Sequence, residues 1–232
     1  MDDVYFYQPD NTIKYINECT LWVLGRSTTL MMEDRKEKKW LEPMWMQAND
    51  MKGIVVYISK IDAEIAALHA RNTGESWRVY PLDDFNVTEM MNDNRLHTGN
   101  NSYNFLFSFG FWLNTTGALI AKEHVLSQAL VVEGFRVDSR YNTGGKIIIR
   151  FSHDNFNFMV TSWNNKIKSH SEYKEYLGRV NKHSACEAEK QARLALSKIE
   201  ICKTTEYIPV IAGVWSVVDE KWIMSNLNNS VN

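Results

Sequence analysis

Four residues near the middle of the chain have the types used by enzymes that act on nucleic acids or nucleotides: Glu133, Asp138, Lys146 and His153. A metal-dependent site of this kind places one acid on a strand and an acid-x-Lys element on the next strand. Asp138 and Lys146 flank a predicted hairpin, but Gly144 stands two positions before Lys146, where an acid is needed. Glu133 comes from the same strand as Asp138 and does not fill that place. Such an enzyme is therefore our alternative hypothesis, not the leading one.

A second group of possible ligands lies near the C-terminus. His183, Cys186 and Glu187 stand at positions i, i+3 and i+4, a spacing that places them on one helical face and that can hold a metal ion. Cys186 has no neighbouring cysteine, however, and nothing indicates the two further ligands that zinc requires. The chain also lacks the glycine patterns of phosphate-binding loops. We expect neither a metal ion nor a cofactor.

A local excess of basic residues suggests a second alternative, a nucleic-acid-binding module. Residues 166–203 contain nine basic and five acidic side chains, and Tyr173 and Tyr176 lie among them as possible stacking platforms. The acidic first hundred residues oppose contact with phosphates. The candidate contacts at the start of this region are Lys166, Lys168, Lys174, Arg179 and Lys182.

The leading candidate for an interaction surface surrounds Pro43. Trp40, Met44, Trp45 and Met46 lie within seven residues, and Pro43 prevents them from sharing one uninterrupted helix. They therefore cannot all point into one core. Methionine and tryptophan make adaptable contacts of high energetic value at protein interfaces. This segment predicts a binding site for another protein.

Composition and charge narrow the class of protein. The chain has 232 residues, a net charge of −2 and 44% hydrophobic residues, which excludes a disordered or fibrous chain and leaves no bulk attraction to nucleic acid or to an anionic membrane. The acidic start, Met1-Asp2-Asp3, does not resemble a secretory signal. The three cysteines are few and odd in number, so we expect free thiols. These observations predict a cytoplasmic protein without membrane contact.

The N-terminal part of the chain predicts both strands and helices. Apolar runs predict strands at residues 4–7, 53–59 and 77–82. Ile61, Ile65 and Leu68 share one face of a helix that Ser59 caps and Gly74 ends. With the strands on either side, this helix would form a βαβ-type unit. The sequence does not decide whether its two strands are parallel. The apolar and aromatic residues in 12–24 are spaced partly as in a helix. The charged run 33–39 predicts a solvated helix that Pro43 ends or kinks.

The middle of the chain predicts strands. Every odd position from Tyr103 to Leu113 is apolar, and Gly110 marks a bulge or a close backbone approach. A turn at 115–117 precedes a short helix in 118–126. Strand-like runs at 129–137, 146–151 and 156–163 are joined by short turns and predict an antiparallel meander.

The last seventy residues predict mainly helices. Ser169 and Glu172 fit a capping box, after which Tyr173, Leu177 and Val180 share a face. Small residues from Ala185 to Cys202 form one helical stripe that should lie flat on the sheet. A final strand at 208–214 and a final helix at 215–227 complete the prediction.

Together these patterns predict an α+β protein with a central antiparallel meander sheet packed by C-terminal helices and an N-terminal α/β portion. We expect one domain over 1–232, with a soft internal boundary near residue 98 between the acidic α/β part (1–98) and the sheet with the C-terminal helices (99–232). The leading functional hypothesis is a non-catalytic cytoplasmic factor that binds another protein, of the inhibitor, immunity or defence type. High asparagine and low proline suit an AT-rich gene of the kind that phages and mobile elements have.

Overall fold

The computed structural model describes residues 4–7, 20–31, 37–48, 51–82, 102–136, 148–151, 170–203 and 211–226. Within them the helices are α1 (Lys60–Asn72), α4 (His170–Val180) and α5 (Ala185–Ser197). The strands are, in chain order, β1 (Val4–Tyr7), β2 (Trp22–Met31), β3 (Glu37–Pro43), β4 (Trp45–Ala48), β5 (Met51–Tyr57), β6 (Arg78–Pro81), β7 (Ser102–Leu113), β8 (Leu119–Lys122), β9 (Val125–Leu126), β10 (Gln128–Arg136), β11 (Ile148–Phe151), β12 (Ile201–Lys203), β13 (Ile211–Ser216) and β14 (Lys221–Asn226).

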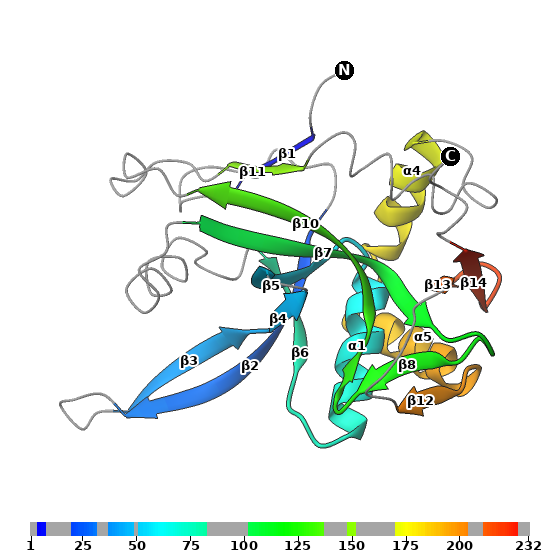
Figure 1. The fold of residues 1–232 in the computed structure, drawn as a ribbon, viewed down its shortest axis with the longest axis horizontal. Coiled ribbons are helices and arrows are strands. Elements are labelled where there is room, and N and C mark those ends of the chain that lie inside the picture. The colour runs from blue at the N-terminus through cyan, green and yellow to red at the C-terminus, as the bar shows by residue number, and fades with distance from the viewer. Residues whose placement is uncertain are drawn as a thin grey trace.

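A large mixed sheet forms the centre of the molecule (Figure 1). Its strand order is β12-β8-β7-β5-β2-β3, and β10 and β13 also pair with β7. Most pairs are antiparallel, whereas β5–β7 and β12–β8 are parallel. The coarse α+β prediction is therefore confirmed.

The predicted meander is not how the described strands pair. β10 pairs with β7 along most of its length, while β11 pairs with β1 in a separate two-stranded sheet. β10 and β11 are thus not adjacent strands of one meander. The third predicted strand, 156–163, lies outside the described residues.

β7 is the strand around which the core is built. Phe105, Phe107 and Phe111 are fully buried, as the alternation predicts, but Leu106 and Ser108 on the other face are fully buried too. Both faces of β7 are therefore covered. Gly110 has a φ of +147° at the place where the register between β7 and β10 shifts, which confirms the predicted bulge.

The predicted βαβ-type unit is formed by β5, α1 and β6. The Ser59 hydroxyl accepts from the Asp62 amide at 3.3 Å and caps α1, and Gly74 with a φ of +105° follows its end. β5 and β6 both pair antiparallel with β2, so they run in the same direction with β2 between them.

α5 packs against α1 rather than flat on the sheet. Its small residues Ala188, Ala192 and Ala195 are buried, and α1 has a similar series of buried alanines, so the two helices approach closely. The β13–β14 hairpin touches α5 through Trp222, whose indole donates to the Ala195 carbonyl at 2.9 Å. The predicted stripe continued too far, because α5 ends at Ser197 and Cys202 lies in β12.

Three predicted helices are wrong where the structure describes them. Residues 118–126 form the β8–β9 hairpin and residues 215–226 form most of the β13–β14 hairpin. Glu123 and Glu220 take positive φ values of 52° and 47° in the two turns, a backbone conformation that helices exclude. The charged run 33–39 contains the start of β3, which begins at Glu37 and pairs with β2. The end of the segment 12–24, whose spacing is partly helical, lies in β2.

Other predictions fall on residues that the structure does not describe, including residues 12–19 and Ser169 of the capping box. The turn at Gly117 is confirmed, with a φ of +82°. Among the described residues, no helix is long and apolar enough to cross a membrane.

The side-chain amide of Asn181 joins separate elements at the turn between α4 and α5. Its Oδ1 accepts from the indole of Trp22 at 3.0 Å and from the backbone amide of Lys60 at 2.8 Å. Its Nδ2 donates to the carbonyls of Ile58 at 3.0 Å and Thr20 at 3.3 Å. One amide thus ties the C-terminal helices to the start of β2 and to the β5–α1 junction.

We expect Asn181→Ala to lower the free energy of unfolding by about 3 kcal/mol, because four polar groups lose a partner and two of them are the Trp22 indole and Lys60 amide donors in a partly buried place. Urea unfolding measures the loss. Lys182→Ala, which changes the exposed next residue, should stay within about 0.5 kcal/mol of the parent protein. Equal effects of the two substitutions would contradict the role of Asn181.

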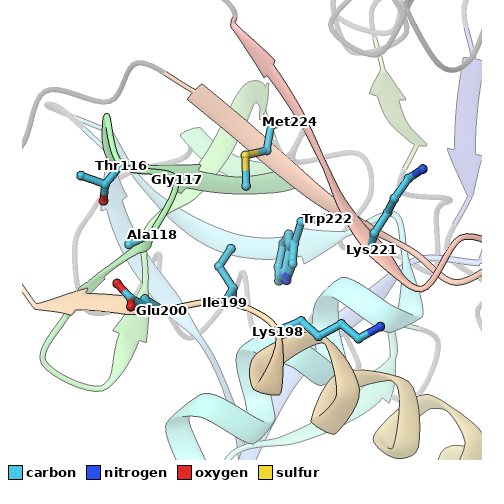
Figure 2. Close-up of a pocket in the computed structure, with 9 residues that line it drawn as sticks. All are labelled: Thr116, Gly117, Ala118, Lys198, Ile199, Glu200, Lys221, Trp222 and Met224. Atoms are coloured by element: carbon cyan, nitrogen blue, oxygen red, sulfur yellow. The ribbon is translucent and has the colours of Figure 1, made fainter.

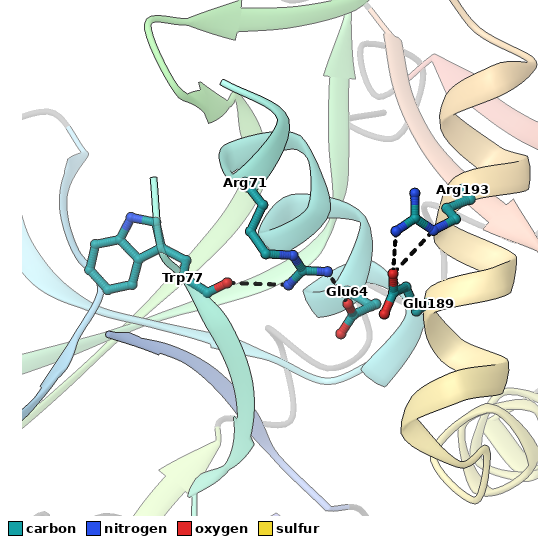
Figure 3. Close-up of polar contacts among 5 residues, drawn as sticks. All are labelled: Glu64, Arg71, Trp77, Glu189 and Arg193. Carbon is teal, nitrogen blue, oxygen red and sulfur yellow. Dashed lines mark hydrogen bonds and ion pairs between the residues drawn. The ribbon is translucent and has the colours of Figure 1, made fainter. Parts of the chain in front are cut away.

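Two arginine–glutamate pairs differ sharply in burial (Figure 3). Arg71 of α1 lies 2.6 Å from the carboxylate of Glu64 and donates to the Trp77 carbonyl at 3.2 Å, and the Glu64 side chain is only 10% exposed. Arg193 contacts Glu189 along α5, and their side chains are 64% and 41% exposed. The first pair links α1 to the segment that leads into β6.

We expect Arg71→Met to cost about 2 kcal/mol, since it leaves the Glu64 carboxylate and the Trp77 carbonyl without a partner while it keeps the aliphatic packing. Arg193→Met is the matched control and should cost less than about 0.5 kcal/mol. Thermal or urea unfolding of the two variants tests this difference, and a similar loss in both would refute it.

Candidate functional site

The carboxyl group of Asp62 is the most unusual polar group of the described core. Asp62 lies in the first turn of α1 and is 4% exposed. Its backbone amide is used by the Ser59 cap, but its carboxyl accepts no hydrogen bond from the described residues. Burial raises the pKa of this carboxyl from 3.8 to about 7.

A second helix shows what the same sequence pattern does when it is complete. At α5, the Ser184 hydroxyl accepts from the Glu187 amide, and the Glu187 carboxylate accepts from the Ser184 amide at 2.8 Å. These hydrogen bonds lower the pKa of Glu187, which is exposed. Asp62 has the equivalent position after Ser59, yet its carboxyl does not return to the cap. It therefore has no capping role.

Two tyrosines and a glutamine extend the polar cluster around Asp62. The Gln128 amide donates to the Tyr57 hydroxyl at 2.6 Å, and the Tyr176 hydroxyl of α4 donates to the Trp215 carbonyl at 2.8 Å. Burial first, and the Asp62 charge in addition, raise the pKa of both tyrosines. Oε1 of Gln128 is enclosed and has no hydrogen-bond partner among the described residues. We define Tyr57, Asp62, Gln128 and Tyr176 as the acid cluster.

The acid cluster can hold a proton that is exchangeable near neutral pH. A carboxyl with a pKa near 7 is the form that general acids and bases use. Asp62 is only 4% exposed, which leaves a substrate little access to its carboxyl. As it stands, the cluster is a proton-binding site of the core.

A shallow groove of about 290 Å³ is the second candidate (Figure 2). Lys198 donates to the Glu220 carbonyl at 2.8 Å, and the Lys221 ammonium lies 4.0 Å from the Asp219 carboxylate, so both cations at the rim are engaged. The groove is therefore mainly an apolar surface. Its lining consists of Thr116, Gly117, Ala118, Lys198, Ile199, Glu200, Lys221, Trp222 and Met224.

The predicted binding residues lie along β3 and β4. Trp40 stands opposite Thr28 in the β2–β3 ladder. Met44, between the two strands, is 4% exposed and belongs to the core, whereas Trp45 and Met46 are partly buried and pack against the core. The Lys52 ammonium lies 5.8 Å from the Trp45 ring centroid. Their role in binding stays a prediction.

The predicted catalytic and nucleic-acid residues are only partly described. Glu133 lies on β10 opposite Phe105, while Asp138, Lys146 and His153 fall outside the described residues. Lys174 lies on α4, and Arg179 and Lys182 are exposed at its end. Lys166 and Lys168 are not described. Both alternatives therefore stay predictions.

The possible metal ligands of α5 have other partners. Glu187 is used in the capping box, and His183 Nδ1 lies 3.2 Å from the Arg179 carbonyl. Within the described parts of the chain, no group of three or more His, Cys, Asp or Glu side chains could hold a metal ion.

Sequence reasoning recognised Ser59 as a helix cap and missed the acid cluster, in which Asp62 stands three positions after that cap. The signal available was the serine–acid spacing, which predicts an engaged carboxyl. In comparisons with protein-family models, curated proteins and solved structures, nothing matches the chain.

The raised pKa of Asp62 makes stability depend on pH with a definite sign. The unfolded chain releases the Asp62 proton near pH 4, while the folded protein keeps it until about pH 7. The contribution to stability is therefore present below pH 4 and is lost as the pH rises toward 7. Asp62→Asn should raise the free energy of unfolding at pH 8 by a few kcal/mol, at about 1.4 kcal/mol per pKa unit, and should change it little at pH 4.

Glu187→Gln is the control with the opposite sign. Because the pKa of Glu187 is lowered in the folded protein, its contribution is present above the unfolded pKa, and the variant should be less stable than the parent at neutral pH and equal to it in acid. Urea unfolding across this pH range measures both. A pH-independent effect of Asp62→Asn would show that its carboxyl does not titrate as described.

Proposed function

We propose that the chain is a non-catalytic factor that binds another protein, and that the β2–β3 arm is its main contact element. We define the arm as residues 26–31 and 37–42. It projects from the body of the molecule as a two-stranded ribbon (Figure 1). Acting by occupying another protein is how inhibitor and immunity-type factors work.

The observation that carries this proposal is that the two strands of the arm pair with each other and with no other described strand. β2 pairs with β6 only as far as Gly25, and with β5 only at Trp22. From Arg26 to Met31 it pairs only with β3 among the described strands. At roughly 3.3 Å per residue, this ribbon reaches about 20 Å. An isolated two-stranded ribbon is marginally stable in water, so a partner that covers it would add stability.

The base of the arm is held in place by Arg26. Its guanidinium lies 2.7 Å from the carboxylate of Glu42 on β3 and 3.1 Å from that of Glu75 before β6. It also lies 4.8 Å from the Trp77 ring centroid. These contacts connect both strands of the arm to the α1–β6 segment. A fixed direction reduces the entropy that a contact element loses on binding.

The predicted Met and Trp segment adjoins the arm. Trp40 belongs to β3, which pairs with β2. After Met44 the chain continues as β4, which carries Trp45 and Met46 and pairs with β5. The Met44 amide donates to the Leu24 carbonyl at 2.8 Å, and its carbonyl accepts from Val55 at 3.1 Å. The partly buried side chains at this base would widen the contact surface of the arm.

The charge of the arm favours a protein over a nucleic acid. The arm contains three basic and two acidic side chains, and the whole segment 26–42 contains five basic and four acidic ones. A surface that binds phosphates carries a clear excess of cations, and this segment has almost none. Mixed charges beside apolar residues are typical of protein interfaces.

A photo-crosslinking residue at position 39 of the arm tests the proposal in the cells that make the chain. We expect a discrete adduct with one other protein. The same residue at the exposed position Lys190 on α5 is the matched control and should give no such adduct.

The outcomes separate the alternatives. An adduct that nuclease treatment removes would support the nucleic-acid hypothesis instead. Adducts at both positions, or none at position 39, would overturn the assignment of the arm. Substituting Trp45 is a poorer test, because its packing against the core makes lost binding and lost stability hard to separate.

A further inference from the structure

His69, in the last turn of α1, is a buried histidine whose ring has an unused nitrogen. The residue is 3% exposed, and Nε2 of its ring is enclosed and has no hydrogen-bond partner among the described residues. The His69 carbonyl accepts from the amide and the hydroxyl of Thr73, at 3.2 and 3.1 Å, so the end of α1 holds the residue in place. Such an enclosed position favours the neutral imidazole.

Two basic side chains from other elements act on this ring. His124 lies in the turn of the β8–β9 hairpin, Lys203 is the last residue of β12, and both are exposed. The hairpin lies beside α1, and β12 pairs with β8 so that Lys203 stands opposite Ala121 (Figure 1). Burial first, and then the charges of Lys203 and His124, lower the pKa of His69 below its ordinary value of 6.5. A proton on His69 would therefore meet positive charge from both elements.

The carboxylates of the elements around α1 do not offset this charge. Among the described residues, no carboxylate raises the pKa of His69. Three of them pair with arginines, as Glu64–Arg71, Glu75–Arg26 and Glu189–Arg193. Glu187 serves the α5 cap, and Glu123, beside His124, is exposed. The nearby cations Arg78 of β6 and Lys122 of β8 are exposed too.

The elements that carry His124 and Lys203 are attached to the sheet by short strands. β9 has two residues, and β12 has three, which pair only with β8 among the described strands. β8 in turn has one described pair with β7, Leu113↔Leu119, at the end of β8 away from His124. Short strands with few partners open at a lower free energy than a long central strand such as β7.

We propose that His69 is a pH-sensitive switch whose protonation releases the β8–β9 turn and β12 from the C-terminal end of α1. In the closed form the imidazole is neutral, and the two basic side chains stay beside it. Uptake of a proton places a charge in the core next to Lys203, and opening of this end lets water reach the ring. The central strands β5 and β7 stay paired, since they carry no part of this contact.

The lowered pKa of His69 gives the pH dependence of this switch its sign. In the open or unfolded chain His69 binds a proton near pH 6.5, whereas the closed form binds it only at a lower pH. The closed form is therefore fully stable above this pH and loses stability as the pH falls below it. This dependence is opposite in sign to that of Asp62, so the two groups can be distinguished.

Amide exchange of the full chain, followed by mass spectrometry at about pH 7.5 and about pH 5, tests the proposal. After correction for the intrinsic effect of pH on exchange, segments 119–126 and 201–203 should exchange more than about threefold faster at the lower pH, while β7 changes little. His69→Leu removes the titrating ring without breaking a described side-chain hydrogen bond, so the acceleration should disappear.

His124→Gln is the matched control, because it removes an exposed imidazole and leaves the buried one, so most of the acceleration should persist. No acceleration in the parent protein, or an equal one in β7, would overturn the proposal, and so would an unchanged acceleration in His69→Leu. If that variant does not fold, the His69 ring of the parent is titrated by NMR. A midpoint below 6.5 is expected there, and a midpoint at or above 6.5 would contradict the switch.

Discussion

The arrangement of the described structure depends on the four hydrogen bonds of the Asn181 amide. This amide connects the turn between α4 and α5 to Thr20, Trp22, Ile58 and Lys60. These partners lie at the start of β2 and at the β5–α1 junction. The same junction holds Asp62, and α4 contributes Tyr176 above it. The Asn181 hydrogen bonds therefore join the end of the helix that carries Tyr176 to the start of the helix that carries Asp62.

The parts of the fold that sequence reasoning predicts correctly are those with strong local patterns. The alternation from Tyr103 to Leu113 and the apolar run before Ser59 each read as a strand in any context, and the Ser59 cap marks the helix that follows. The failures are the segments 118–126 and 215–226. Their side chains fit a helical period about as well as a strand period, and pairing with distant strands decides between the two. Leu119, for example, pairs with Ile201 about eighty positions later.

The candidate sites are harder to predict than the fold, because they depend on which polar groups lack a partner. Ser59-x-x-Asp62 and Ser184-x-x-Glu187 have the same pattern, yet one carboxyl is hydrogen-bonded and exposed while the other is buried and free of the cap. The shorter aspartate side chain and the core above α1, formed by residues far away in sequence, separate the two cases. Met44 is misassigned in the opposite direction. Its sequence neighbours predict an exposed binding residue, whereas in the fold its side chain is buried in the core.

The arm is held at its base and paired with few neighbours beyond it, and this bears on how it would bind. Arg26 joins the base to Glu42 and to Glu75 before β6, whereas from Arg26 to Met31 β2 pairs only with β3 among the described strands. An element held at its base loses less entropy when it binds, and an isolated ribbon gains stability when it is covered. Both effects would favour a partner that contacts the arm along its length over one that touches only its base.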